Sequence, residues 1–281
     1  MYSSLFFNLP IQIFFPKIWD GFLIFIFGLS VGSFLNCVIY RLALPNPARR
    51  DLGGLKSRSY CPHCKHNLGW QDLIPILSFL ILKGKCRYCQ KPISLQYPLV
   101  ELATGILFLL IVFRFSSDFL FSIFCLLISC FLIIIFVYDL KHYIIPDKII
   151  YPAIAIALIF NTFYSIFIIN NSKFLIQSLL SALGAASFFL IIVLVSRGRW
   201  MGIGDIKLAF FMGLFLSFPG ILIALFSAFL VGAILGLWLV AFGKKTMKSE
   251  VPFGPFLVTG TFIALFFSQP LINWYWNLFL I

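Results

Sequence analysis

The sequence contains few charged residues. Only 11% of its 281 residues are Asp, Glu, Lys or Arg, whereas 62% are hydrophobic. Soluble domains carry roughly 25% charged residues, so this composition excludes an ordinary soluble globular protein and indicates a chain embedded in a membrane. Acidic residues are scarcer still, with nine Asp and Glu against 21 Lys and Arg. Any carboxylate beside an apolar run therefore needs an explanation.

A second absence concerns symmetry. No internal repeat is apparent, and polar residues are not spread along several of the apolar runs. Secondary transporters tend to show both features, so their absence argues against a transporter.

Long apolar runs dominate what is present. A helix needs about 20 apolar residues to cross a bilayer, and the sequence contains eight candidate runs, of which the sixth is short. The first run has no basic segment before it and continues into the charged stretch YRLALPNPARR, so we expect a spanning helix rather than a cleaved signal. The runs lie at roughly 18–38, 98–115, 119–138, 149–169, 174–196, 205–217, 221–242 and 256–275.

The basic residues predict an orientation in the membrane. They concentrate in the first long loop, between Arg41 and Lys91, and at alternate later connections, whereas Lys17, Arg114 and Lys173 lie on the other side. With eight crossings, the positive-inside rule places the basic loops in the cytoplasm and both termini outside. Membrane topology and contact with lipid then explain the net charge of +12, and no nucleic-acid partner is expected.

Four cysteines in the first long loop form two CxxC pairs. Cys61 and Cys64 are separated from Cys86 and Cys89 by 21 residues, close to the spacing of zinc ribbons. Two such turns can surround one ion with four thiolates and leave no open position, which predicts a structural zinc site. The alternative is a redox-active dithiol, which two matched pairs disfavour. The neighbouring histidines are assigned to the solvated surface; they are His63 and His66.

Two aspartates could carry hydrolytic chemistry. The third run ends at FVYDLKHYIIPDK and the sixth begins at GIGDIK, so Asp139 and Asp205 reach the same predicted cytoplasmic boundary from different helices. Two nearby carboxylates can hydrolyse an amide, because one deprotonates water while the other donates a proton. A negative charge at the end of a helix opposes the macrodipole, so Asp139 has the weaker structural explanation.

Other residues near the aspartates have structural alternatives. Asp205 could cap its helix, and Asp147 fits that role better, so capping is the main expectation for Asp147. Lys207 could pair with a carboxylate or extend to lipid headgroups, and we slightly favour the headgroups. Gly202 and Gly204 could admit an extended substrate segment, through positive φ or a close backbone approach, or they could form a flexible break.

Together these motifs resemble those of the type IV prepilin peptidases, a family of GxGD aspartyl proteases. The resemblance rests on DLKHYIIPD, GIGDIK, CPHC with CRYC, VGSFLNCVIYRL, YPLVELATG and VPFGPFL, in their order along most of the chain. It implies a multi-pass inner-membrane enzyme that cleaves the leader of prepilins and pseudopilins after a glycine on the cytoplasmic side. The implied catalytic pair is Asp139 and Asp205. The residues expected to support this pair are Gly202, Gly204, Lys207 and Asp147.

The resemblance implies a second activity, which is methylation of the new amino terminus with S-adenosylmethionine. In the family this activity is linked to the cysteine loop and to a glycine just before the second CxxC, matched here by Gly84. Glu101 is a weaker candidate for cofactor binding. Because the sequence has no glycine-rich nucleotide fingerprint, it does not place the S-adenosylmethionine pocket.

These features predict an all-helical polytopic membrane protein with about eight transmembrane helices and a small cytoplasmic zinc knuckle. The expected segments are a first transmembrane helix in 1–40, a zinc-binding loop domain in 41–97 and a transmembrane aspartyl protease core in 98–281. Two alternatives remain open. One is a secondary transporter with Asp139 and Asp205 as ion-coupling carboxylates, and the other is a non-catalytic assembly factor that binds partners through the zinc loop.

Overall fold

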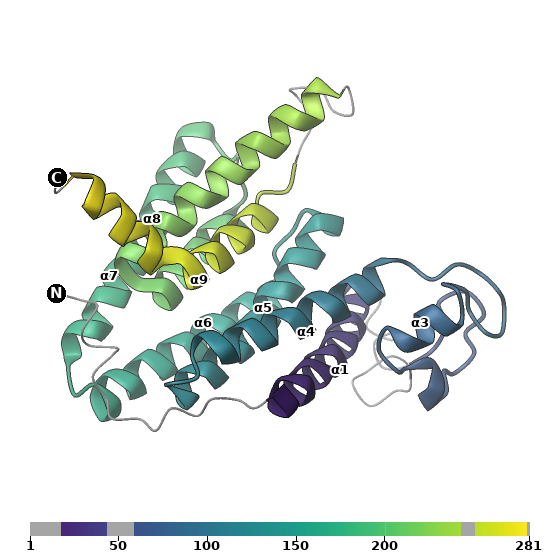
Figure 1. The fold of residues 1–281 in the computed structure, drawn as a ribbon. Helices are drawn as coiled ribbons and strands as arrows, with labels where there is room; N and C mark the ends of the chain where they lie inside the picture. Colours follow the sequence, from purple (N-terminus) through teal and green to yellow (C-terminus); the bar gives the residue numbers. More distant parts are fainter. Residues whose placement is uncertain (1–17, 44–58, 200, 243–250, 280–281) are drawn as a thin grey trace. The chain divides into compact units, whose positions relative to one another are not determined.

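A computed structural model describes residues 18–43, 59–199, 201–242 and 251–279 (Figure 1). Within these residues the regular secondary structure is helical, apart from two isolated bridges in the cysteine loop. Several basic residues used for the orientation, including Lys17, lie outside the described part. The chain divides into two compact units, Met1–Ile133 and Ile134–Ile281.

The first unit consists of two long packed helices, a loop between them, and the start of a third helix. Its elements are α1 (Ile18–Leu42), η1 (Trp70–Asp72), α3 (Leu77–Ile81), α4 (Gln96–Arg114) and the first part of α5 (Phe119–His142). Glycine lets α1 and α4 approach closely, because a Cβ added at Gly28 would lie 2.8 Å from the Gly105 Cα atom. Small residues at such crossings are typical of membrane helices. The end of α1 and the start of α4 lie near the predicted boundaries of the loop domain, 41–97. The division of the chain into a first helix, a loop domain and a protease core stays a prediction.

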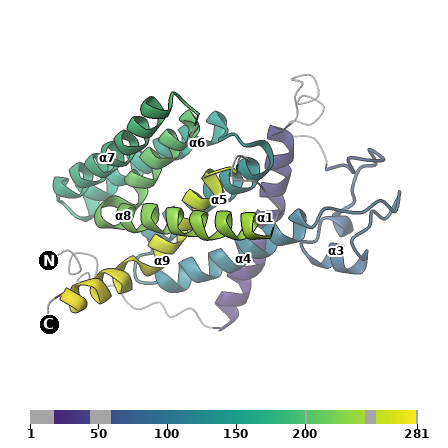
Figure 2. The same ribbon diagram turned by 90° about the horizontal axis from the view of Figure 1, so that it is seen from above.

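The second unit is a helical bundle. Its elements are the end of α5, α6 (Asp147–Phe163), the π-helical turn η2 (Tyr164–Ile168), α7 (Ser172–Ser196), α8 (Ile203–Ala241) and α9 (Gly254–Phe279). Helices α7, α8 and α9 lie side by side (Figures 1 and 2). Glycine again permits close contact, since Gly260 of α9 packs on Ala224 and Ala228 of α8.

Helix α8 is broken near its middle. Ser217 (φ 53°, ψ 178°) and Phe218 (φ −80°, ψ 139°) have non-helical backbone angles, and Pro219 follows them. The Gln177 side chain of α7 donates a hydrogen bond to the Phe218 carbonyl at 2.7 Å. The break therefore lies at the level of Gln177 on α7.

The chain reverses direction at this break. Further along α7, Ala182 contacts Gly213, which precedes the break, and Phe189 stacks on Phe229, which follows it. Both parts of α8 thus leave the break in the same direction along α7. They correspond to the sixth and seventh predicted apolar runs.

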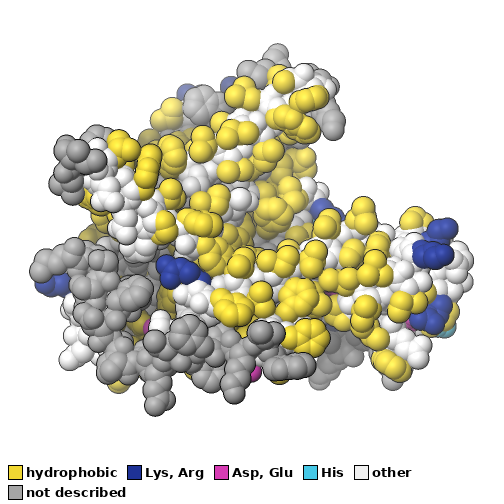
Figure 3. Space-filling model, in the orientation of Figure 1, with side chains coloured by type: hydrophobic (Ala, Val, Ile, Leu, Met, Phe, Trp, Pro, Cys, Tyr) yellow, Lys and Arg dark blue, Asp and Glu magenta, His cyan; other side chains and the backbone are white. Residues whose placement is uncertain are grey.

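Among the described residues, seven helices are long and apolar enough to cross a membrane. One of them is α8, whose 39 residues would extend about 58 Å as a straight helix, roughly twice the hydrocarbon thickness. Figure 3 shows hydrophobic side chains over the helices and Lys and Arg side chains at the end of the first unit that carries the cysteine loop. The prediction of an all-helical, multi-pass membrane protein is confirmed, and the number of eight spans stays a prediction.

Candidate active site and metal centre

Asp139 and Asp205 line a single cavity of about 600 Å³ in the second unit. Asp139 lies in the last turn of α5, and Asp205 lies in the first turn of α8. The remaining walls come from the connection between α5 and α6, the connection between α7 and α8, and the segment before α9. Residues of three motifs, DLKHYIIPD, GIGDIK and VPFGPFL, therefore meet at one site.

Asp139 is buried, with 4% of its surface exposed. Its Oδ2 atom accepts a hydrogen bond from the N–H group of Gly254 at 3.0 Å. Gly254 is the first residue of α9, where N–H groups have no partner within the helix and the macrodipole favours an anion. A Cβ atom at Gly254 would collide with the Asp139 carboxylate. The start of α9 thus compensates for the unfavourable position of Asp139 at the end of α5.

Asp205 is also buried, with 9% exposed. The N-cap of α8 is Gly202, and Asp205 is the third helical residue, so the alternative that Asp205 is itself the N-cap is wrong. Its Oδ2 atom accepts a hydrogen bond from the Gly202 N–H at 3.2 Å, as the acidic residue of a capping box does. A carboxylate can accept several hydrogen bonds, so this contact orients Asp205 without using all its acceptor positions.

The two glycines of GIGD do not have positive φ. Gly202 has φ −84°, and within the described residues the positive-φ glycines are Gly84 and Gly198. A Cβ added at Gly204 would lie 3.1 Å from the Ile145 Cβ atom. Gly204 therefore lets Ile145, from the DLKHYIIPD motif, pack closely against the start of α8. Admission of a substrate segment beside these glycines stays a prediction.

Asp147 and Lys207 form an ion pair at the edge of the cavity. The N-cap of α6 is Pro146, and no side chain caps this helix, so the expectation that Asp147 caps α6 is wrong. Its Oδ1 atom lies 2.6 Å from Lys207 Nζ, although its side chain is 60% exposed. Lys207 also lies 4.9 Å from the centroid of the Tyr151 ring. Of the two alternatives for Lys207, the structure shows pairing with a carboxylate, because the starts of α6 and α8 are adjacent.

In the first unit, the two CxxC pairs form turns with the same backbone pattern. In each turn the N–H of the first cysteine donates to the carbonyl five residues later, and its carbonyl accepts the N–H four residues later. The residue that donates this N–H has positive φ, 57° at Lys65 and 58° at Gln90. An isolated bridge flanks each turn. The two CxxC segments therefore have the same local fold, and this structural repeat was not apparent in the sequence.

The four cysteine Sγ atoms lie within 4.8 Å of one another. Cys61 Sγ and Cys89 Sγ are 3.9 Å apart, and a tetrahedral ion with metal–sulfur bonds of about 2.3 Å needs sulfur atoms about 3.8 Å apart. The cluster therefore fits a four-coordinate metal ion. His63 and His66 are exposed and are not part of the cluster, which confirms their assignment to the surface.

The thiols differ in their tendency to ionise. Burial opposes ionisation of Cys61, but the backbone N–H groups of Cys64 and His63 stabilise its thiolate and lower the pKa to about 7. The Lys91 N–H stabilises the Cys89 thiolate, whereas partial burial and the neighbouring thiols raise the pKa of Cys89 to about 11. A bound cation would stabilise all four thiolates together, because metal binding displaces the thiol protons.

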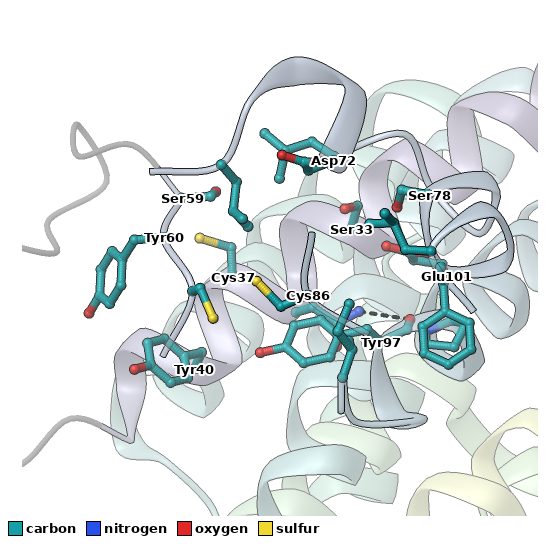
Figure 4. Close-up of a pocket in the computed structure, with 18 of the residues that line it drawn as sticks. Ser33, Cys37, Tyr40, Ser59, Tyr60, Asp72, Ser78, Cys86, Tyr97 and Glu101 are labelled. Atoms are coloured by element: carbon teal, nitrogen blue, oxygen red, sulfur yellow. Dashed lines mark hydrogen bonds between the residues drawn. The ribbon is translucent and has the colours of Figure 1, made fainter. Parts of the chain in front are cut away.

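The remaining predicted site residues also lie in the first unit. Glu101 lines a second cavity (Figure 4), and Gly84 does not.

The sequence analysis assigned no role to Gly254, although the stretch PFGPF has a feature typical of a helix start. Proline is favoured at the start of a helix, so the Gly-Pro pair could have indicated a helix N-terminus there, whose free N–H groups are possible partners for a carboxylate.

The fold and this cavity define the chain as a multi-pass membrane protein with two buried aspartates from separate helices. Comparison with known families is more specific. Residues 26–115 match the Bacterial Peptidase A24 N-terminal domain, and residues 126–237 match the Type IV leader peptidase family. The chain belongs to the type IV leader peptidase family.

Curated relatives match nearly the whole chain and are named prepilin leader peptidase/N-methyltransferase. The relative from Aeromonas hydrophila is 32% identical over 92% of this chain and 94% of its own length. The relative from Legionella pneumophila is 33% identical over 89% and 92%, and that from Pseudomonas aeruginosa is 31% identical over 88% and 90%. No solved structure matches the chain significantly.

Proposed function

We propose that this protein is a membrane-embedded aspartyl endopeptidase that removes the leader of type IV prepilins and pseudopilins after a glycine. Asp139 and Asp205 are its catalytic pair. The observation that carries the proposal is that both buried carboxylates line one cavity, and that each is oriented by one backbone N–H. The names of the curated relatives supply the substrate class.

The chemistry needs one ionised and one protonated carboxylate. The ionised group takes a proton from water, whose oxygen attacks the carbonyl carbon of the scissile peptide bond, while the protonated group donates to the carbonyl oxygen. Collapse of the tetrahedral intermediate breaks the C–N bond, and the leaving nitrogen receives a proton from the pair. Two carboxylates in one cavity favour sharing a single proton, so the pair is ready for this division of roles. Water is the nucleophile, and no acyl-enzyme forms.

The same chain N-methylates the new amino terminus of its product. The printed names of the relatives combine the two activities, and S-adenosylmethionine is the proposed methyl donor. The cysteine cluster holds a structural zinc ion, because its sulfur spacing fits tetrahedral zinc and four protein ligands leave no open position for catalysis.

The cavity and the cysteine loop face the cytoplasm of a bacterial inner membrane. The concentration of Lys and Arg in the loops of that side supports this orientation. A prepilin anchored in the same membrane would then present its leader boundary at the depth where α5 ends and α8 begins. Nothing in the comparisons supports the alternative of a secondary transporter.

A mass measurement on a coexpressed prepilin tests both activities. Loss of the leader reports proteolysis, and an added methyl group on the new amino terminus reports the transferase. An intact prepilin in the presence of the folded, membrane-inserted protein would contradict the peptidase. A cleaved but unmethylated product would contradict only the second activity.

A further inference from the structure

Helix α7 provides a scale for depth in the second unit. Its sequence has no charged residue between Lys173 and Arg197. At 1.5 Å per residue it extends about 30 Å from Gln177 to its C-cap Arg197, which equals the thickness of the hydrocarbon core. Gln177 and Arg197 therefore mark the outer and inner ends of the membrane-spanning part of α7.

The break in α8 confirms the outer end of this scale. Phe218, whose carbonyl accepts the hydrogen bond from Gln177, is 55% exposed and has a non-helical backbone. Exposed irregular backbone is not found in the hydrocarbon core, so the break lies at a membrane boundary. The exposed Lys173 is only about 6 Å before Gln177 along α7.

Contacts of α9 place the catalytic carboxylates on the same scale. The Gly254 N–H bonds to Asp139, and the ring of the preceding residue, Phe253, has its centroid 6.2 Å from that of Phe189 in α7. Along α7, Phe189 lies about 18 Å from Gln177 and about 12 Å from the inner end. Asp139 is therefore close to a level that lies well inside the hydrocarbon core.

Two other helices give similar depths. Along α8, Asp205 lies about 17 Å from Leu216, the last helical residue before the break. Along α9, Gly254 lies about 22 Å from the exposed Gln269. Exposed aromatic residues, typical of a membrane interface, follow it: Trp274, Tyr275 and Trp276. Both distances are shorter than the hydrocarbon thickness of about 30 Å.

The cavity of the two aspartates connects this depth with the inner end of α7. Its walls include Asp139 and Asp205 and also Gly198 and Arg199, which directly follow the C-cap of α7. Irregular backbone at membrane depth is tolerated where it lines a water-filled cavity, and ionisable groups at that depth face such cavities. The cavity thus provides a polar route from the inner surface to the aspartates.

We propose that the scissile bond is cleaved about 12 Å inside the inner end of α7, at hydrocarbon depth, and that bilayer thickness therefore controls cleavage of membrane-anchored substrates. The proposal rests on the peptidase part of the proposed function. In an ordinary bilayer the leader boundary of a prepilin has to be drawn from the surface into the cavity, whereas a thinner bilayer brings the surface closer to the aspartates. A short peptide without a membrane segment enters from water and is not held at a fixed depth.

The test compares two substrates in bilayers of different thickness. The purified full-length protein is reconstituted into vesicles of dimyristoleoyl, dioleoyl or dierucoyl phosphatidylcholine, whose acyl chains increase in length in that order. The kcat/KM for a full prepilin should fall about tenfold from the shortest to the longest chains, because each ångström of mismatch adds to the cost. The value for a soluble peptide that spans the cleavage site should change little. Asp205→Asn in the same vesicles controls for background hydrolysis.

Three outcomes contradict the proposal. Equal prepilin cleavage in all three bilayers would show that depth does not limit the reaction. An equal fall for both substrates would show that the bilayer acts on the enzyme and not on the position of the substrate. If neither substrate is cleaved in any bilayer, the peptidase assignment itself fails, and the proposal fails with it.

A pair of variants tests the depth without measuring activity. Ile191 and Val195 are 61% and 72% exposed and lie one turn apart on α7, with Ile191 close to the level of Phe189. A lysine at hydrocarbon depth is costly, whereas one near the surface can extend to the headgroups. In the longest-chain vesicles Ile191→Lys should therefore lower the unfolding temperature more than its matched control, Val195→Lys. Equal unfolding temperatures would show that the level of the aspartates is not within the hydrocarbon core.

Discussion

The Gly254 N–H group donates a hydrogen bond to Asp139 Oδ2 at 3.0 Å, across 115 residues of sequence. This contact joins the start of α9 to the end of α5, beside the cavity that Asp139 and Asp205 both line. It leaves no space for a side chain at Gly254, because a Cβ atom there would overlap the carboxylate.

Gly254→Ala should therefore reduce leader cleavage by about a hundredfold or more, since a small displacement of a reacting group can have an effect of that size. Gly236→Ala is the matched control, because a Cβ atom at that helical glycine meets nothing within 4 Å. Cleavage of a detergent-solubilised prepilin is measured for both. Full activity in a folded Gly254→Ala protein would show that this contact does not position Asp139.

The aspartate pair itself is tested by Asp139→Asn and Asp205→Asn. Each change is nearly isosteric and keeps an oxygen for the backbone N–H, but an amide cannot accept the proton from water. Each should reduce cleavage by about a thousandfold or more, and the double variant should be no worse than either single one, because the pair acts as a unit. Appreciable turnover by either single variant, verified as folded and free of wild-type protein, would exclude the pair.

Asp147 and Lys207 should contribute far less. The Asp147 side chain is 60% exposed, and exposed ion pairs contribute about 0–1 kcal/mol. Asp147→Asn should keep substantial cleavage activity. A double-mutant cycle with Lys207→Gln, measured on the free energy of unfolding, should give a coupling below about 1 kcal/mol. Complete loss of cleavage in Asp147→Asn would instead place this carboxylate in the chemistry.

The break in α8 offers a test of stability. The Asn161 side chain donates a hydrogen bond to the Leu214 carbonyl at 2.8 Å, in a buried site close to the break. Asn161→Leu keeps the number and branching of the side-chain heavy atoms but leaves that carbonyl without its side-chain partner, so the free energy of unfolding should fall by about 1–3 kcal/mol. Thr162→Val is the control, because its hydroxyl bonds within its own exposed helical turn. Denaturant titration in detergent measures both, and equal stability of the two variants would contradict the role of Asn161.

The cysteine cluster should contain about one zinc ion per chain. Serine at any one of the four positions should lower the zinc content of the purified protein and the stability of the loop. Cys130→Ser is the matched control, because Cys130 lies in α5 outside the cluster and bonds to the Leu126 carbonyl. A metal-free protein that is fully stable and active would exclude a structural zinc ion.

The sequence by itself determined the class of this protein and much of its chemistry. The long apolar runs, with so few charges, predict membrane helices. Inside a bilayer the backbone N–H and C=O groups need hydrogen-bond partners within the protein, and a helix provides them within one segment. The paired CxxC spacing predicted the metal cluster, and the positions of Asp139 and Asp205 at the ends of two runs predicted a shared site, because these local patterns depend only on helix length and chain order.

The tertiary structure decided what depends on contacts between distant segments. Gly254 reaches Asp139 across 115 residues, and Lys207 pairs with Asp147 across 60, so neither partner can be read from local spacing. Gly204 matters for the packing of Ile145 and not for positive φ, and a Cβ atom at Gly84 would lie 3.1 Å from the Phe79 ring. In each case the role of the residue depends on a distance between atoms of segments that packing brings together. The helical period of 3.6 residues describes a single segment, so it carries no information about that distance.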